Sequence, residues 1–169
     1  AVTLPYFISR VGTSEPFSFY GRFTLNASTA SSDAIIGRDD NTLGKWFVRI
    51  KSNSQRTLYF VKDNSGGDVS ITSPNQSFTV GEPFNMGVAS HGGIGNTDFY
   101  VNGRLRSGSG GSSAYNHDGT LKFNAYSNNQ DFEFIYFWRE QVPSKVFTDL
   151  DVDPYRYLKP KLPLYAAWL

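Results

Sequence analysis

The feature that most constrains the fold of this chain is a strictly alternating run near its start. Residues 17–25 read FSFYGRFTL, with phenylalanine, glycine and leucine at the odd positions and polar residues or tyrosine at the even ones. Because the side chains of a β-strand point alternately to its two faces, this order predicts a strand with one aromatic face.

Similar short runs recur at near-regular intervals along the chain. Further strands are predicted at Trp46–Lys51, Thr57–Lys62, Ser77–Val80, Phe84–Ala89, Asp98–Asn102, Leu121–Ala125 and Phe132–Arg139. Turn residues separate them, and Asn102-Gly103 is a strong signal for a two-residue hairpin, since both positions tolerate positive φ. Many short strands without a long helical period predict an all-β fold, a two-sheet antiparallel sandwich.

One short helix and a C-terminal arm depart from this pattern. Ser144 is predicted to cap a helix of one or two turns that runs through Leu150 and ends before Pro154. We expect a sandwich domain over residues 1–153 and an arm over residues 154–169, where three prolines resist regular structure. The arm is too rich in aromatic and apolar residues for a typical disordered tail. It is expected to pack on its own sandwich or on a partner subunit, and the sequence leaves both open.

Composition excludes several functional classes. A length of 169 residues indicates one domain at roughly 150 residues per domain. The chain has no cysteine, which excludes disulfides, thiolate zinc sites and cysteine nucleophiles. A net charge of +1 argues against a strongly basic nucleic-acid binder, and no apolar run approaches the roughly 20 residues of a membrane-spanning helix. We therefore expect no nucleic acid among its partners and no membrane span.

An ordered set of segments resembles the laminin-G-like, or concanavalin A-like, jelly roll. Its members are the runs at residues 17–25, 46–50, 57–61, 81–89, 99–105 and 132–139, with Glu133 at a position that is usually acidic in the family. The late helix and Asp153-Pro154-Tyr155 complete an arrangement most familiar from structural proteins of tailed bacteriophages. The resemblance covers roughly residues 15–158 and implies a jelly roll. It also implies a virion decoration, cement or tail component, sometimes able to bind glycans.

Loop residues supply a candidate glycan site. Aromatic rings stack on the apolar faces of sugars, while amides and charges bind the hydroxyl groups. The candidates are Tyr115, Asn116, His117, Asp118, Tyr126, Asn128 and Arg104. The alternative for each of them is that asparagine and its polar neighbours simply fill turns.

Two acidic residues invite comparison with the glycan hydrolases that share this fold. Asp131 and Glu133 lie two apart on a predicted strand, which would place them on one face about 6.6 Å apart. The hydrolase motif needs a third acid on that face, and Ile135 and Phe137 follow instead. We expect no catalytic residue, and we expect Glu133 to pair with a loop or with Arg139.

Metal binding has one weak candidate. Asp149, Asp151 and Asp153 lack the glycine and the closing glutamate of a calcium loop. An oxygen-rich loop that could hold Ca²⁺ weakly is formed by Asp39, Asp40 and Asn41. No other cofactor is expected.

The arm supplies a candidate assembly surface. Its residues are Tyr155, Arg156, Tyr157, Lys159, Lys161, Leu164, Tyr165 and Trp168. Left in solvent it would form an apolar patch, and its cations could meet an acidic capsid shell.

The sequence thus predicts a non-enzymatic virion protein, a decoration or cement subunit on the capsid surface. Its expected partners are the major capsid protein, further copies of itself in a homo-oligomer and, through the outer loops, cell-surface glycans. The alternative is a carbohydrate-binding module of a phage tail or an extracellular adhesin. A glycan hydrolase is the third hypothesis.

Overall fold

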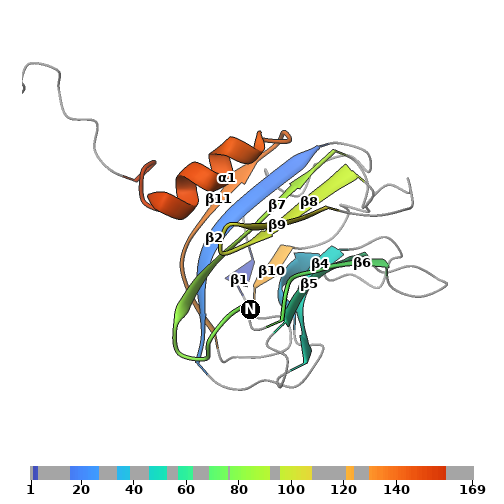
Figure 1. The fold of residues 1–169 in the computed structure, drawn as a ribbon, viewed down its shortest axis with the longest axis vertical. Coiled ribbons are helices and arrows are strands. Elements are labelled where there is room, and N and C mark those ends of the chain that lie inside the picture. The colour runs from blue at the N-terminus through green and yellow to red at the C-terminus, as the bar shows by residue number, and fades with distance from the viewer. Residues whose placement is uncertain are drawn as a thin grey trace, which may run out of the picture.

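The computed structural model describes residues 2–3, 16–26, 34–38, 46–52, 57–62, 69–75, 77–91, 96–107, 121–123 and 130–158. These residues form two antiparallel sheets that face each other, with one helix on the outer side of the second sheet (Figure 1). The predicted all-β sandwich is therefore confirmed.

The six-stranded sheet has the order β1 (Val2–Thr3), β10 (Leu121–Phe123), β3 (Ala34–Arg38), β4 (Trp46–Ser52), β5 (Thr57–Lys62), β6 (Val69–Thr72). The five-stranded sheet has the order β11 (Gln130–Trp138), β2 (Phe17–Leu25), β7 (Pro83–Ser90), β8 (Thr97–Val101), β9 (Arg104–Ser107). The helix α1 (Ser144–Val152) follows β11 in the chain. Strand β11 thus forms one edge of its sheet and β9 the other.

The inner faces of the two sheets enclose an aromatic core. Strand β2 has the predicted bounds, and its alternation turns Phe17, Phe19 and Phe23 inward, where all three are buried. The Trp46 ring stacks on Phe17 at 5.1 Å and on Phe19 at 5.6 Å between centroids. Each such ring contributes about 1.5–3 kcal/mol by leaving water, so this layer accounts for much of the sandwich's stability.

A second cluster fills the space between the outer face of the five-stranded sheet and α1. Tyr20, Tyr100 and Phe134 of the sheet pack there against Phe147 and Leu150 of the helix, which are both buried. A side chain at position 87 would keep the helix away, because a Cβ there would lie 2.8 Å from the Phe147 ring. Glycine at this position therefore lets the helix lie directly on the sheet.

Two local predictions need correction, and one is confirmed. Residues 77–80 form no strand: the chain turns there, with the Gly81 amide donating to the Leu25 carbonyl at 2.8 Å. The N-cap of α1 is Pro143, with no side-chain cap bond, and Ser144 is the first helical residue. The β8–β9 hairpin is as predicted, with φ of 46° at Asn102 and 69° at Gly103.

Candidate binding site at the β11 edge of the five-stranded sheet

The outer face of β11 carries three aromatic rings in a row. Phe134, Tyr136 and Trp138 alternate along the strand and point to the side on which α1 lies. Ile135 and Phe137 point the other way and pack against the core between the sheets. The edge strand thus joins a buried face to an aromatic outer face.

The chain returns to this strand directly after the helix. Residues 153–158, here called the strap, form successive turns, with the Arg156 amide donating to the Asp153 carbonyl at 3.2 Å. The turns bring Tyr155 against Phe134, with centroids 5.4 Å apart and planes at 65°. Such edge-to-face contacts are favoured between aromatic rings, so the strap packs specifically rather than loosely.

A pocket lies between the strap and the end of β11. It has a volume of about 320 Å³ and is lined by Ile135, Tyr136, Phe137, Trp138 and Tyr157. The Tyr157 ring stands at 89° to the Tyr136 ring, 5.5 Å away, and 53% of the residue remains exposed. This pocket is at the lower end of the roughly 300–1,000 Å³ typical of small-molecule sites. Its lining residues include two tyrosines and a tryptophan, side chains that carry hydroxyl and indole N–H groups as well as apolar rings.

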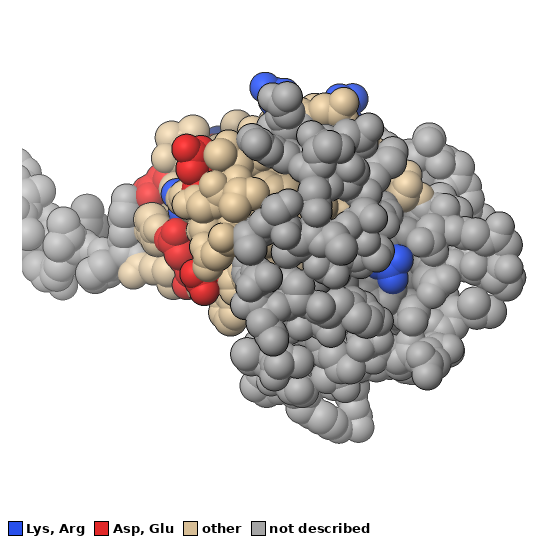
Figure 2. Space-filling model, turned by 90° about the horizontal axis from the view of Figure 1, so that it is seen from below, with Lys and Arg blue, Asp and Glu red and all other residues tan. Residues whose placement is uncertain are grey.

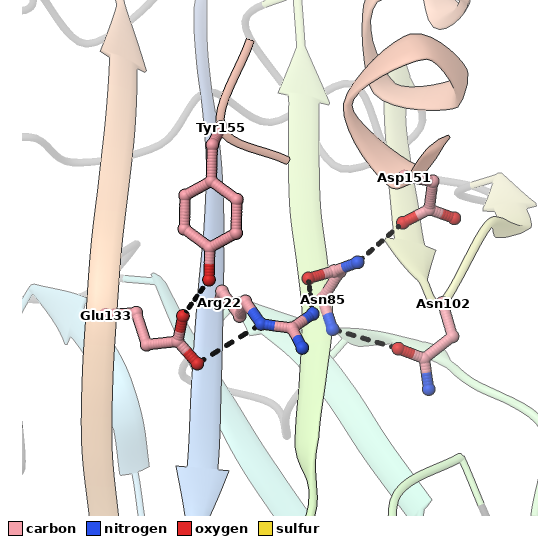
Figure 3. Close-up of polar contacts among 6 residues, drawn as sticks. All are labelled: Arg22, Asn85, Asn102, Glu133, Asp151 and Tyr155. Atoms are coloured by element: carbon pink, nitrogen blue, oxygen red, sulfur yellow. Dashed lines mark hydrogen bonds and ion pairs between the residues drawn. The ribbon is translucent and has the colours of Figure 1, made fainter. Parts of the chain in front are cut away.

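A β-bulge places Glu133 beneath the strap. Phe132 pairs with Phe23 and Phe134 pairs with Arg22, so Glu133 is the extra residue of the bulge. Its carboxylate accepts a hydrogen bond from Arg22 Nε at 3.2 Å and another from the Tyr155 hydroxyl (Figure 3). The bulge therefore turns an acidic side chain toward the strap and anchors it.

The same polar network continues across the sheet to the helix. Arg22 Nη1 donates to Asn85 Oδ1 at 3.1 Å, and Asn85 Nδ2 donates to Asp151 Oδ1 at 3.2 Å (Figure 3). The backbone N–H of Asn85 donates to Asn102 Oδ1 at 2.9 Å. The Tyr20 hydroxyl also donates to Asp151 Oδ1, at 3.0 Å. The network joins β11, β2, β7, the β8–β9 hairpin and the C-terminal end of α1, from which the strap begins.

The tyrosines of this region remain protonated at neutral pH. Burial, followed by the charge of Asp153, raises the pKa of Tyr136, whose hydroxyl donates to the Pro154 carbonyl at 3.1 Å. The hydrogen bond to Glu133 is the main cause that raises the pKa of Tyr155. Burial, followed by the charge of Asp151, raises the pKa of Tyr20. All three therefore act as neutral donors.

Most of the predicted glycan site cannot be placed. Tyr115, Asn116, His117, Asp118, Tyr126 and Asn128 lie outside the described residues. Arg104 is described and exposed on β9, at the opposite edge of the sheet from the β11 pocket. The structure therefore does not bring Arg104 to the pocket.

The predicted metal loop, Asp39, Asp40 and Asn41, also lies outside the described residues. Within the part of the chain that the structure describes, no group of three or more histidine, aspartate and glutamate side chains could hold a metal ion. Asp149 instead pairs with Lys145 at 2.7 Å and with Arg156 at 2.8 Å. In that part, too, no helix is long and apolar enough to cross a membrane.

The strap contains the first residues of the predicted arm. Tyr155, Arg156 and Tyr157 are described, whereas Lys159, Lys161, Leu164, Tyr165 and Trp168 are not. Tyr155 and Tyr157 contact β11 of their own chain. The expectation for the rest of the arm stays a prediction.

Glu133 was predicted to be a structural acid that pairs with a loop or with Arg139, and the loop alternative is confirmed. Its carboxylate accepts from the Tyr155 hydroxyl, in the turns of the strap, and also from Arg22 of β2, which the sequence did not indicate. Asp131 accepts from Asn26 Nδ2 at 2.6 Å. Because the bulge interrupts the alternation between the two acids, the regular-strand spacing does not apply to them.

Sequence reasoning missed the pocket itself, although a signal for it exists. The tyrosines at positions 155 and 157 are spaced by two, like the aromatic residues at 134 and 136 on the strand that they contact. Two aromatic pairs with the same spacing, separated by one short helix, could have indicated that the chain doubles back. The sequence pattern of β11 predicted the last long strand, but it was not interpreted as one wall of a binding site.

No protein-family model matches this chain, and none of the curated proteins matches it. Solved structures match its fold. One is from botulinum neurotoxin type C, whose cell entry is described as dependent on interaction with two ganglioside molecules. It has a TM-score of 0.67 and 23% identity, over 89% of this chain and 38% of that one. Another is the binding domain of botulinum neurotoxin DC in complex with SialylT, with a TM-score of 0.67 and 20% identity over the same shares.

A sialidase of Trypanosoma rangeli, in complex with 2,3-difluorosialic acid, also matches. Its TM-score is 0.60 at 11% identity, over 85% of this chain and 23% of that one. This chain thus spans well under half the length of these structures. At such identities the likeness shows a shared β-rich fold. It does not establish the expected laminin-G-like family or the link to tailed bacteriophages.

Proposed function

We propose that this chain is a carbohydrate-binding module that holds a sugar in the pocket at the β11 edge. The observation that carries the proposal is the pocket itself, which has a volume of about 320 Å³. Its lining residues are Ile135, Tyr136, Phe137, Trp138 and Tyr157. Of the functions that the sequence predicts, this was the alternative, and the geometry supports it better than capsid decoration.

The chemistry of the lining suits a sugar. A pyranose has an apolar face of C–H groups, which packs against an aromatic ring, and a rim of hydroxyls, which needs hydrogen-bond partners. Trp138 and Tyr157 supply ring surface, and the Tyr157 hydroxyl and Trp138 indole N–H supply polar groups. The Tyr136 hydroxyl is less available to bind a sugar, because it already donates to the Pro154 carbonyl.

The structural comparisons support the same class of function. Two of the matching toxin structures are described in terms of gangliosides and SialylT, which are properties of those proteins. This chain covers only 38% of each, so the binding of the whole toxin domain does not transfer by fold alone. The proposal therefore rests mainly on the aromatic pocket of this chain and not on what the toxins bind.

The proposal includes no catalytic step. Glu133 and Asp131 are both engaged in hydrogen bonds, one with Arg22 and Tyr155 and the other with Asn26. Either acid would have to leave these partners to act on a glycosidic bond. A glycan-binding module of this kind would work outside the cell or on a virion surface.

Capsid decoration stays an untested prediction. No contact among the described residues favours it, since Tyr155 and Tyr157 pack on their own strand. Co-sedimentation with undecorated capsids, with and without residues 154–169, tests it directly. Stoichiometric pelleting that depends on those residues would establish it.

The test of sugar binding uses the full chain on a glycan array, followed by calorimetry with the strongest ligand. Tyr157→Ala and Trp138→Ala should each weaken binding at least about tenfold, as expected for central aromatic contacts. Tyr157 is the cleaner probe, because Trp138 also packs edge-on against Phe147 of the helix. Circular dichroism melts check that each variant folds.

Leu105→Ala is the matched control, since Leu105 is 48% exposed on β9 at the opposite sheet edge. It should bind as the unchanged protein does. Binding that survives both Tyr157→Ala and Trp138→Ala in folded protein would contradict the proposal.

A further inference from the structure

We infer that the β11 pocket binds one sugar residue at a time and gains little affinity from the residues linked to it. This inference rests on the proposed function and specifies its ligand class, which is a monosaccharide or one residue of a glycan rather than a stretch of chain. It comes from the way in which the strap covers the aromatic row of β11.

The outer face of β11 carries enough rings for a longer ligand. The centroids of Phe134 and Tyr136 are 5.0 Å apart, and those of Tyr136 and Trp138 are 5.9 Å apart. Successive residues of an extended glycan can each pack on one ring of such a row. Without the strap, the row would therefore predict a surface that binds a chain.

The strap closes most of this row. The Tyr155 ring packs edge to face on Phe134, which is only 9% exposed. The Tyr157 ring stands at 89° to the ring of Tyr136, whose hydroxyl already donates to the Pro154 carbonyl. A second sugar residue could reach these rings only by displacing the strap.

Hydrogen bonds hold the strap in this position. The Tyr155 hydroxyl donates to the Glu133 carboxylate, and Arg156 Nη1 donates to Asp149 Oδ2 at 2.8 Å. A sugar residue that displaced the strap would break these bonds, and its ring contact would only replace the ring contact that the strap already makes. The net gain in affinity from a second residue is therefore small.

Trp138 is the ring of the row that remains for a ligand. Within the described part of the chain, no ring of the strap packs on Trp138, and it lines the pocket with Tyr157. At about 30 Å³ per water molecule, the 320 Å³ of the pocket is the space of roughly ten waters. A pyranose has about that many non-hydrogen atoms, and a disaccharide has about twice as many. One sugar residue therefore fills the pocket.

The experiment is a length series measured by calorimetry on the full chain. The probes are glucose, galactose, mannose and N-acetylglucosamine, each as the monosaccharide and as β1,4-linked oligomers of up to four residues. They are neutral because the lining of the pocket is uncharged, whereas Figure 2 shows acidic side chains gathered on the left of the described surface. Charge on the ligand therefore does not contribute to the comparison.

We expect the affinity of a tetramer to exceed that of its monosaccharide by less than about fourfold, which is the statistical gain from offering the same residue four times. A row that binds a chain would instead add about tenfold for each further ring contact. Trp138→Ala should weaken the binding of every length to the same extent, at least about tenfold. Leu105→Ala, at the opposite edge of the sheet, is the matched control and should leave every length unchanged.

The outcomes separate the inference from the function. A larger rise with length, or tetramers that bind where their monosaccharides do not, would overturn the inference and leave the proposed function intact if Trp138→Ala or Tyr157→Ala removes that binding. Binding that survives both variants in folded protein would contradict the proposed function, and the inference with it. So would a lack of binding to every one of these probes and to the array.

Discussion

Glu133 is the side chain on which the strap depends most directly. It bridges Arg22 of β2 and the Tyr155 hydroxyl of the strap, and Tyr157 stands two residues further on as a wall of the pocket. Loss of either hydrogen bond should therefore change sugar affinity by shifting the strap, and with it Tyr157, because Glu133 does not line the pocket. Glu133 is in this sense a positioning residue.

Tyr155→Phe removes the hydroxyl and keeps the ring that packs on Phe134. We expect affinity for the array-selected glycan to fall about threefold, because an exposed hydrogen bond to a charged group contributes modestly. Glu133→Gln should have a similar effect, and the double variant should lose less than the sum, because both changes break one interaction. Calorimetry on the four proteins gives the coupling.

Asp131→Asn is the control for this cycle, since Asp131 is an exposed acid on the same strand that bonds Asn26 instead. It should leave affinity unchanged. Fully additive losses in Tyr155→Phe and Glu133→Gln would show that Glu133 does not act through the strap.

Gly87 decides how closely α1 lies on the sheet. A Cβ at this position would come within 2.8 Å of the Phe147 ring and 3.1 Å of the Phe19 carbonyl oxygen, so Gly87→Ala forces the helix or the strand to shift. Overpacking of this kind should lower the free energy of unfolding by about 1–3 kcal/mol, measured by urea denaturation. Val152→Ala, at an 85% exposed helical position, should change it little, and an equal loss in both variants would exclude the packing explanation.

At the scale of elements, the layer between α1 and the sheet should make stability fall in alkaline solution. Burial, followed by the charge of Asp98, raises the pKa of Tyr100 to about 12, above the ordinary value of 10.0. Between pH 10 and 12 the unfolded chain therefore releases this proton before the folded chain does. Its stabilisation is complete below pH 10 and is lost as pH rises through about 12, at a cost of about 2 kcal/mol.

Urea unfolding of the unchanged protein and of Tyr100→Phe at pH 8 to 12 measures this contribution. The unchanged protein should lose more stability than the variant across that interval. Parallel curves would show that Tyr100 ionises equally in both states. Tyr20, whose pKa is also raised, remains in both proteins and cancels from the comparison.

Local patterns predicted the strands whose alternation is strict, and failed where pairing depends on distant residues. Strand β2 alternates over nine residues, so its bounds and its inward face could be predicted. Strand β3, read as AIIGR, and strand β6, read as VSIT, are short and were missed. The prediction of a strand at residues 77–80 was wrong. The Gly81 amide that follows them bonds to the Leu25 carbonyl, and no local pattern in the sequence indicates that distant contact. The bulge at Glu133 is equally invisible, since it exists only in register with β2.

For the molecule as a whole, the sequence predicted the two sheets and the late helix, but it did not predict the pocket at the β11 edge. That place requires the strap to return across the helix onto β11, which joins residues about 20 positions apart through ring contacts. The expectation of sugar-binding aromatic residues was sound in its chemistry. It was directed to loops that lie outside the described residues, whereas the described pocket lies at a sheet edge.

The most direct test of a sugar site at the β11 edge is the set of indole N–H signals in a ¹⁵N correlation spectrum during glycan titration. The chain has three tryptophans, and Trp138→Phe assigns the signal of the one that lines the pocket. We predict that the Trp138 signal shifts in a saturable manner with the same dissociation constant as calorimetry, while buried Trp46 does not respond. Saturable glycan binding that leaves the Trp138 signal unmoved would contradict the account.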